Sequence, residues 1–247
     1  MIVLFTDFGP GGPYTGQMKA VLAREAPGVP VVDLADDLPA CDPEPAAYLL
    51  AAFVPAFPPG AVFVCVVDPG VGSDRAPLAL SAGERWFVGP DNGLLAIVAQ
   101  HARDARWFTI TWQPPALSAS FHGRDLFAPV AARIARGEAV PGAPLDGAAP
   151  VGIDWPADRA AIVYIDPYGN AMTGLRADRL PADATIAAGA RRFTRLRTFS
   201  DAEPGAAFWY ENANGLAEIA VNRGRADRVL GLQVGTPIRI ETAGGAG

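Results

Sequence analysis

The chain has 247 residues and a formal net charge of −6; half of its residues are hydrophobic, and its sequence isoelectric point is about 4.9. This acidic balance is not that of a general nucleic-acid binder, and no stretch approaches the roughly 18 apolar residues that a membrane span requires. Because the chain starts in a strand-like segment without a basic leader, we expect a compact cytoplasmic protein.

Apolar runs and helical periodicity alternate through the first half of the chain, which predicts an α/β domain built on a mainly parallel sheet. Two of the expected strands end just before an aspartate, and the carboxyl ends of such strands face the ligand crevice of an open α/β sheet. The expected strands are Ile2–Phe5, Val29–Leu34, Ala61–Val67, Leu78–Ser81 and Trp86–Val88, and the expected helices are Tyr14–Glu25, Glu44–Phe53, Leu94–Gln100 and Leu126–Arg136.

Residues 137–159 are rich in Gly, Pro and Ala and are the best candidate for a linker. The short runs AIVYI, ATIAA, RFTRL, AAFWY, LAEIAV and PIRIE follow at close spacing, which indicates a small all-β domain of sandwich or barrel type. We therefore predict an N-terminal Rossmann-like α/β domain over residues 1–152 and a smaller, barrel-like β domain over residues 153–247.

Four ionisable residues are candidates for a site. Asp68 ends the third strand, and the following PGVG turn lets Arg75 return to it as a charge-assisted pair, which is also what an ordinary structural salt bridge requires. Asp7 is placed to accept hydrogen bonds from a ribose diol, although a turn or capping role is favoured from its position alone. His122 precedes a helix for which Asp125 is the expected N-cap, and a lone histidine is more often structural.

Other chemistries find little support in the sequence. No HxxxH or CxxC motif and no other ligand cluster is present, so we expect no metal site. The segment FTDFGPGG lacks a P-loop lysine, and no GxSxG motif follows a strand. Cys41 and Cys65 are too few for a disulfide framework, and Cys65 lies inside an apolar run.

Several segments together resemble one family. TDFG with YTGQMKA, then FPPGAVFVCVVDPGVGSDR, FVGPDNGLL, FHGRDLFAPVAA, YIDPYGNAMT and NGLAEIAVNRG are similar, in this order, to the S-adenosyl-L-methionine hydroxide adenosyltransferases. These are S-adenosylmethionine hydrolases related to the fluorinating and chlorinating enzymes. The similarity runs from residue 5 to about residue 225, and DPGVG followed by arginine, with FHGRD further on, is its most specific part.

The resemblance implies hydrolysis of S-adenosylmethionine to adenosine and L-methionine by attack of water or hydroxide on the ribose C5′. It maps a triad onto Asp68, Arg75 and His122, with Arg75 and His122 positioning the water and Asp68 orienting it; which group accepts the proton stays open. Since the leaving group is a neutral thioether, no metal and no cofactor are expected. The family fold joins an α/β domain to a barrel-like domain, and the family assembly is a trimer with each site between two subunits.

The same matching assigns the substrate-binding residues. It places Asp7 on the ribose hydroxyls, Asp166 on the methionine ammonium, Asn170 on the adenine edge, Tyr168 in the lining of the purine pocket and Phe199 stacked on adenine. The ENANG segment has Asn212 in register, but Ala213 stands where the family has a serine for the amino-acid carboxylate, and Cys41 stands where relatives often have an aromatic residue.

Two alternatives to hydrolysis remain. Halogenating relatives carry tyrosine where Asp68 stands and another aromatic residue where His122 stands, so these two residues favour water over a chlorinase-like use of halide. A non-catalytic sensor of adenosine or S-adenosylmethionine would use Asp7 and the aromatic positions equally well, but it would not need the triad.

Overall fold

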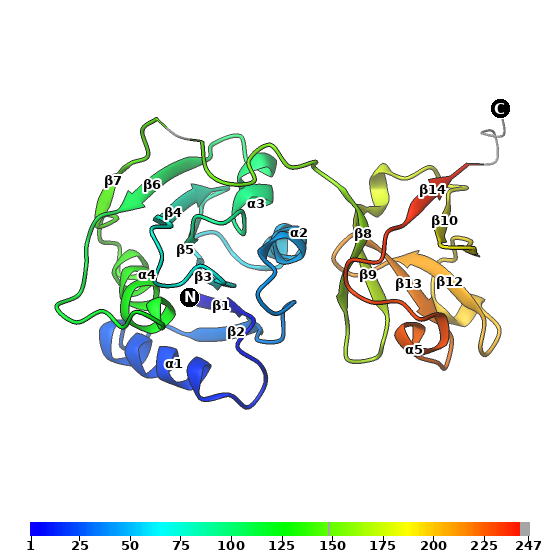
Figure 1. Cartoon of the computed structure of the whole chain (residues 1–247), viewed down its shortest axis with the longest axis horizontal. Coiled ribbons are helices and arrows are strands. Elements are labelled where there is room, and N and C mark those ends of the chain that lie inside the picture. Colours follow the sequence, from blue (N-terminus) through cyan, green and yellow to red (C-terminus); the bar gives the residue numbers. More distant parts are fainter. Residues whose placement is uncertain (148, 243–247) are drawn as a thin grey trace. The chain divides into compact units, whose positions relative to one another are not determined.

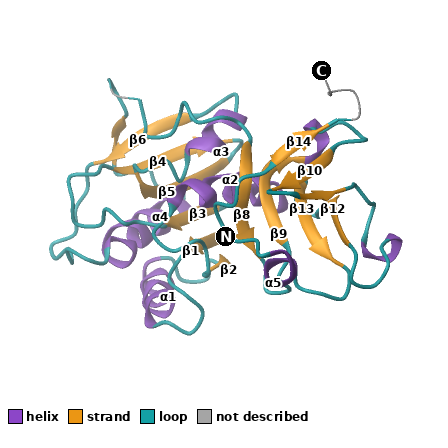
Figure 2. Ribbon diagram, turned by 45° about the vertical axis from the view of Figure 1, so that its right-hand side comes forward, coloured by secondary structure: helices purple, strands orange, loops and turns teal. Residues whose placement is uncertain are grey.

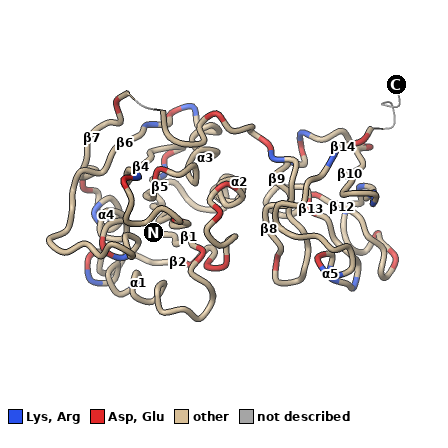
Figure 3. Tube along the Cα trace, viewed as in Figure 1, with Lys and Arg blue, Asp and Glu red and all other residues tan. Residues whose placement is uncertain are grey.

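The structure is a computed structural model that describes residues 1–147 and 149–242 (Figure 1). The chain forms two compact units, Met1–Trp155 and Pro156–Gly247, which we call the N-terminal and C-terminal units. Acidic and basic residues are interspersed along both (Figure 3). None of the described helices is long and apolar enough to cross a membrane.

The N-terminal unit is built on a seven-stranded sheet of order β2-β1-β3-β5-β4-β6-β7. Its first four strands are parallel neighbours, whereas β4, β6 and β7 pair in antiparallel fashion, so the predicted α/β fold with a large, mainly parallel sheet is confirmed. The strands are β1 Ile2–Thr6, β2 Val31–Ala35, β3 Val62–Val66, β4 Pro77–Ala82, β5 Arg85–Pro90, β6 Arg106–Ile110 and β7 Gly142–Pro144.

Helices cover both faces of this sheet (Figures 1 and 2). Strand alternation sends Ile2 and Leu4 into a core with Met18 of α1, whereas Phe5 points oppositely and meets the ring of Phe53 in α2 at 6.5 Å. A proline at the first turn starts both of these helices. The helices are α1 Pro13–Glu25, α2 Pro43–Phe53, α3 Ala96–His101 and α4 Ala128–Ala135.

The predicted start of the last helix was wrong. A π-helical turn over Gly123–Phe127 precedes α4, and Asp125 lies inside this turn instead of capping a helix. The Asp125 carboxylate accepts hydrogen bonds from the backbone N–H of Ser118 at 3.0 Å and from the Arg124 side chain. A π turn contains one residue more than an α-helical turn, and the pattern of apolar residues in the sequence does not reveal this extra residue.

The C-terminal unit consists of antiparallel sheets of order β12-β13-β9-β8 and β11-β10-β14. Apolar side chains of both sheets form one core around fully buried Trp209, whose indole N–H donates to the Ala184 carbonyl at 2.9 Å. Single bridges join Ala161 to Pro237 and Arg195 to Trp209, while closure as a barrel stays a prediction. The elements are β8 Arg159–Ile165, β9 Ala171–Arg176, β10 Thr185–Ala188, β11 Arg191–Phe193, β12 Ala207–Glu211, β13 Leu216–Val221, β14 Arg239–Glu241 and α5 Ala226–Leu230.

Candidate active site

Asp7 and Asp68 lie beyond the carboxyl ends of two adjacent parallel strands. Strand β1 has β2 on one side and β3 on the other, so the chain order reverses at this point, which is where ligands bind in open α/β sheets. The Asp7 backbone N–H donates to the Val66 carbonyl at 3.4 Å, and the Asp7 Oδ2 accepts from the Cys41 N–H at 2.8 Å. The fold therefore aims the carboxylate of Asp7 into the crevice beside Asp68.

Asp68, Arg75 and His122 form a chain of hydrogen bonds, which we call the polar triad. Arg75 Nε lies 3.0 and 3.1 Å from the two Asp68 carboxylate oxygens, and Arg75 Nη2 lies 2.5 Å from Oδ2. The same Nη2 lies 2.8 Å from His122 Nδ1. The Asp68 and Arg75 side chains are only 5% and 9% exposed, so this is a buried, charge-assisted pair.

The loop between Asp68 and Arg75 requires a glycine at position 72. Gly72 has φ +80°, and a Cβ built there would lie 2.5 Å from the Ala119 carbonyl oxygen. The close approach brings the loop after β3 against the segment that carries His122. Three residues spread over more than fifty positions thus meet because this turn has no side chain.

Asp68 and His122 of the triad line a cavity of about 160 Å³, which we call the triad cavity, and Arg75 lies behind them. Asp7, Asp68 and His122 supply its ionisable carboxylate and imidazole groups. Rings of Phe8, Tyr14 and Phe121 pack edge-on or tilted beside it, with centroids 5.4 to 5.8 Å apart, so one wall is aromatic. The lining residues are Asp7, Phe8, Cys41, Val66, Asp68, Val71, Ser120, Phe121, His122 and Gly123.

Burial and neighbouring charges shift two pKa values in the cavity. Burial lowers the pKa of His122, and the positive charge of Arg75 lowers it further, against the opposing effect of the Asp68 and Asp125 carboxylates. The hydrogen-bond network therefore assigns a neutral ring that accepts at Nδ1 and carries its proton on Nε2. Burial raises the pKa of Asp7, although the hydrogen bond from Cys41 opposes this shift.

Four of the other predicted site residues gather in the C-terminal unit, around a hollow of about 640 Å³ that we call the aromatic hollow. Asp166 and Asn170 close a tight turn: Asp166 accepts from the Asn170 backbone at 2.8 Å and from its side-chain amide at 2.9 Å. Tyr168 at the tip is 78% exposed, and the Phe199 ring meets Tyr210 at 5.2 Å. The lining residues are Asp166, Tyr168, Asn170, Phe199, Tyr210, Val221, Arg223, Gly224 and Arg225.

Sequence reasoning missed Tyr210 and Arg225 in this lining. The Tyr210 hydroxyl donates to buried Glu218 at 2.6 Å, and burial together with this bond raises the pKa of the tyrosine. Arg225 pairs with Asp227 at 2.9 Å and donates to the Pro167 carbonyl at 2.7 Å, which fixes the DPYGN turn. The NRG segment before Arg225 belongs to the quoted motifs and is the signal that points to it.

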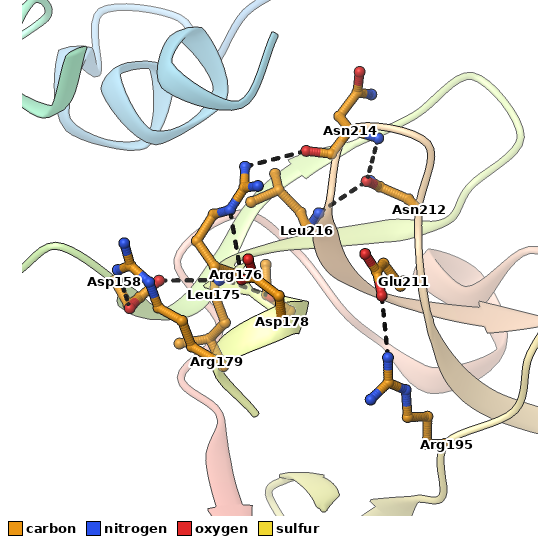
Figure 4. A network of polar contacts seen from close by, with 11 residues as sticks. Asp158, Leu175, Arg176, Asp178, Arg179, Arg195, Glu211, Asn212, Asn214 and Leu216 are labelled. Carbon is orange, nitrogen blue, oxygen red and sulfur yellow. Dashed lines mark hydrogen bonds and ion pairs between the residues drawn. The ribbon is translucent and has the colours of Figure 1, made fainter. Parts of the chain in front are cut away.

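Asn212 lies elsewhere. Its carbonyl oxygen accepts from the backbone N–H groups of Asn214 and Leu216, both at 3.0 Å (Figure 4). Its amide donates to Glu218 at 2.8 Å. It lines a different hollow of about 600 Å³, together with Arg195 and Glu211, which pair at 3.1 Å. The structure thus gives the Asn212 side chain a role in its own hairpin and does not bring it to the aromatic hollow.

No group of three or more His, Cys, Asp or Glu side chains in residues 1–147 and 149–242 could hold a metal ion. Both cysteines are free; Cys41 is exposed, and burial raises the pKa of the Cys65 thiol. The side chains with reactive or polar groups that line the triad cavity are therefore two carboxylates, an imidazole, the Cys41 thiol and the Ser120 hydroxyl.

Comparison with known proteins matches two family models to this chain. The N-terminal domain of the SAM hydroxide adenosyltransferases matches residues 2–143, and their C-terminal domain matches residues 160–239. The chain belongs to the SAM hydroxide adenosyltransferase family. The resemblance inferred from the motifs is thereby confirmed.

Relatives within the family match almost the full chain. Proteins of Thermus thermophilus and Salinispora arenicola, both named (R)-S-adenosyl-L-methionine hydrolase, are 40% and 39% identical over 97% of this chain and cover 98% and 96% of their own lengths. A crystal structure of an uncharacterised conserved protein from Thermotoga maritima has a TM-score of 0.87 at 29% identity, covering 97% of this chain and 99% of the other. A conserved hypothetical protein from Thermus thermophilus has a TM-score of 0.77 at 38% identity, with the same coverage.

Proposed function

We propose that this chain hydrolyses S-adenosyl-L-methionine to adenosine and L-methionine. The observation that carries the proposal is the polar triad of Asp68, Arg75 and His122, two of whose members, Asp68 and His122, line a cavity at the switch point of an α/β sheet beside Asp7. The family of the chain and the relatives named (R)-S-adenosyl-L-methionine hydrolase support the same reaction.

The reaction is a substitution at the ribose C5′. Water attacks C5′, the C5′–S bond breaks, sulfur keeps the electron pair as a neutral thioether, and one proton leaves the attacking oxygen. Because the substrate is a cation and the leaving group carries no charge, no ion is needed to stabilise a departing anion. A nucleophile that becomes anionic as it meets a sulfonium is favoured by a cavity that excludes bulk water.

The triad suits the positioning of that water. Arg75 holds both Asp68 and His122, so their side chains are preorganised before substrate binds. With Nδ1 occupied by Arg75, the Nε2–H group of His122 donates to the water, and Asp68, whose carboxylate also lines the cavity, accepts the proton. A positioned base typically contributes about 10²- to 10⁴-fold, and in-line geometry contributes at least as much.

The family motifs, matched residue by residue, assign substrate groups to the remaining residues. The Asp7 carboxylate would accept hydrogen bonds from the ribose hydroxyls. In the aromatic hollow, Asp166 would bind the methionine ammonium, Asn170 the adenine edge, and the rings of Tyr168 and Phe199 the purine face. Asn212 would act indirectly, through the hairpin that it holds by accepting from the backbone N–H groups of Asn214 and Leu216.

The proposed residues fall into two groups, one in each unit: the triad with Asp7, and the lining of the aromatic hollow. We propose that both groups act on one substrate molecule in a homotrimer, with each site at a subunit interface. The size of the triad cavity, about 160 Å³, supports this division, because a ligand of drug size takes a pocket of roughly 300 to 1,000 Å³. No cofactor takes part in the proposed reaction.

The test is an incubation of purified protein with S-adenosylmethionine, with the chloride concentration varied, followed by chromatography of the nucleosides and amino acids. Equal amounts of adenosine and L-methionine, independent of chloride, are expected. Separate assays of the two sulfonium diastereomers extend the comparison to the (R) form named for the relatives. Chlorinated nucleoside in proportion to chloride would favour a halogenase, and tight binding without any product would favour a sensor.

A further inference from the structure

The ring of Phe127 lies against the guanidinium of Arg75 in the polar triad. The guanidinium carbon of Arg75 is 5.2 Å from the centroid of this ring, a cation–π distance, and Phe127 is fully buried. His122 contacts the same guanidinium through Nδ1 at 2.8 Å. Arg75 is thus held by a carboxylate, an imidazole and an aromatic ring at once.

The π-helical turn explains how His122 and Phe127 reach one guanidinium. In a regular α-helix of 3.6 residues per turn, residues five apart point about 140° away from each other. The turn Gly123–Phe127 instead has the hydrogen bond from the Ala128 N–H to the Gly123 carbonyl, which is five residues back. This bond widens the turn and so brings positions 122 and 127 nearer to one side, and both side chains contact Arg75.

We infer that Phe127 is a positioning residue and that the π turn serves to align it with His122 on Arg75. This inference rests on the proposed function for its effect on turnover, but the alignment itself is independent of the substrate. Single π turns are frequent at functional sites. Here the turn and the residue before it bring Phe127 and His122 against the guanidinium of Arg75, which also binds the Asp68 carboxylate.

Contacts on the outer side hold the turn in this form. Arg124 donates to Gln17 of α1 at 2.9 Å and to the neighbouring Asp125 carboxylate, which accepts from the Ser118 N–H at 3.0 Å. Arg124 also stacks on Phe121, 4.9 Å from its centroid. Gly123 leaves little room for a side chain, since a Cβ would lie 3.2 Å from the Met18 sulfur. The turn is therefore tied to α1 and to the preceding loop.

The test compares Phe127→Leu with Phe63→Leu. Phe63 is also fully buried in the N-terminal unit but stacks on Phe87 at 4.9 Å, on the sheet face opposite to Phe127's cluster. We expect Phe127→Leu to lower kcat about 10- to 100-fold with KM within about twofold, because a small misplacement of catalytic groups is costly. Both variants should lower Tm by similar amounts, because each removes part of a buried ring. Phe63→Leu should nevertheless leave kcat within about twofold of the wild type.

A second readout does not depend on turnover. Titration of the histidine ring signals by NMR, with His122→Asn to assign the two histidines of the chain, should show a higher pKa for His122 in Phe127→Leu than in the wild type, because Arg75 no longer stays against Nδ1. The charged groups that act on the pKa of this ring are Arg75, Asp68 and Asp125. Phe127→Met keeps the apolar volume without the ring and should move the pKa in the same direction if Phe127→Leu fails to fold.

Unchanged kcat and an unchanged His122 pKa in a folded Phe127 variant would overturn the inference and leave Phe127 as a core residue. A raised pKa in a chain that does not hydrolyse S-adenosylmethionine would support the alignment while rejecting the proposed function. Equal losses of kcat in Phe127→Leu and Phe63→Leu, with no pKa change in either, would also count against a positioning role.

Discussion

Arg75 Nη2 lies 2.8 Å from His122 Nδ1, so the imidazole must accept a hydrogen bond at that nitrogen. A guanidinium is always a donor, and a protonated imidazole would place a second donor against it. Protonation of His122 therefore breaks the contact that joins it to Arg75, and the low pKa that burial and Arg75 impose on this histidine keeps the ring neutral at physiological pH.

This relationship predicts the pH dependence of turnover. We expect kcat/KM to stay constant from neutral pH down past the ordinary histidine pKa of about 6.5 and to fall only at lower pH, as His122 becomes protonated. A pH profile of initial rates measures this. Arg75→Gln removes the positive charge and should move the acid limb to higher pH. An acid limb at or above pH 7 in the wild type would contradict the assignment.

The same shift predicts how stability depends on pH. Since the pKa of His122 is lower in the folded than in the unfolded protein, the unfolded chain binds more protons between the two values, and the free energy of unfolding rises with pH in that window. The contribution is complete above about pH 6.5 and is lost as pH falls towards the folded-state pKa. Urea unfolding of wild type and His122→Asn between pH 5 and 8 should show this slope in the wild type alone.

Removal of the Asp68 carboxylate should destabilise the N-terminal unit. Asp68→Ala leaves the guanidinium of Arg75, only 9% exposed, without its counter-charge, and breaking a buried pair typically costs about 3–5 kcal/mol. Asp68→Asn keeps an acceptor oxygen and should cost less. The matched control is Glu138→Ala, which removes an exposed pair with Arg136 and should change stability by less than about 1 kcal/mol. Equal effects of Asp68→Ala and Glu138→Ala on thermal unfolding would refute this reasoning.

Alanine substitutions at two glycines of the C-terminal unit distinguish the cost of backbone strain from the cost of steric overlap. Gly205 has φ +81° with nothing within 4 Å of a built Cβ, so Gly205→Ala should cost about 1–2 kcal/mol from its left-handed conformation alone. Gly169 has φ +88°, and its Cβ would lie 2.6 Å from Asp227 and 2.7 Å from Arg225, so overpacking adds about 1–3 kcal/mol.

Calorimetric melting of both glycine variants checks this difference. Gly169→Ala should also weaken binding in the aromatic hollow, because the DPYGN turn that carries Tyr168 must shift away from Arg225. Gly205→Ala should leave binding unchanged. A Gly169→Ala variant as stable as Gly205→Ala would show that the turn relaxes without cost.

Strong local patterns made much of the N-terminal unit predictable. The buried strands β1 and β3 are continuous apolar runs, and the aspartates that follow them reach the crevice because the parallel strand order places their ends together. The Asp68–Arg75 pair followed from the turn residues between them. The edge strands β6 and β7 were missed, since RWFTI is half exposed and GAP has only three residues.

The remaining features depend on contacts that sequence periodicity does not encode. Strand β9 was missed because Gly174 interrupts its apolar pattern, yet a Cβ there would lie 2.6 Å from that of Arg159 in the neighbouring strand. The π turn at Gly123–Phe127 is held by hydrogen bonds to Gln17, which is far away in the sequence, and to Ser118, which lies in the loop before the turn. The assignment of Asn212 came from motif register alone, and its side chain bonds within its own hairpin.

Subunit complementation tests the division of the proposed site between chains. Asp68→Asn removes a triad residue and Asp166→Asn removes a residue of the aromatic hollow, so each variant alone should be nearly inactive. If each site combines the two groups of residues from different subunits of a trimer, the unfolded variants can be mixed in equal amounts and refolded together. About a quarter of the sites should then be active, because one subunit has an intact triad in half of the cases and its neighbour has an intact hollow in half of the cases. Each variant refolded alone is the control. A mixture no more active than either variant would mean that both groups of residues act within one chain, and light scattering on the wild type would then decide whether a trimer forms at all.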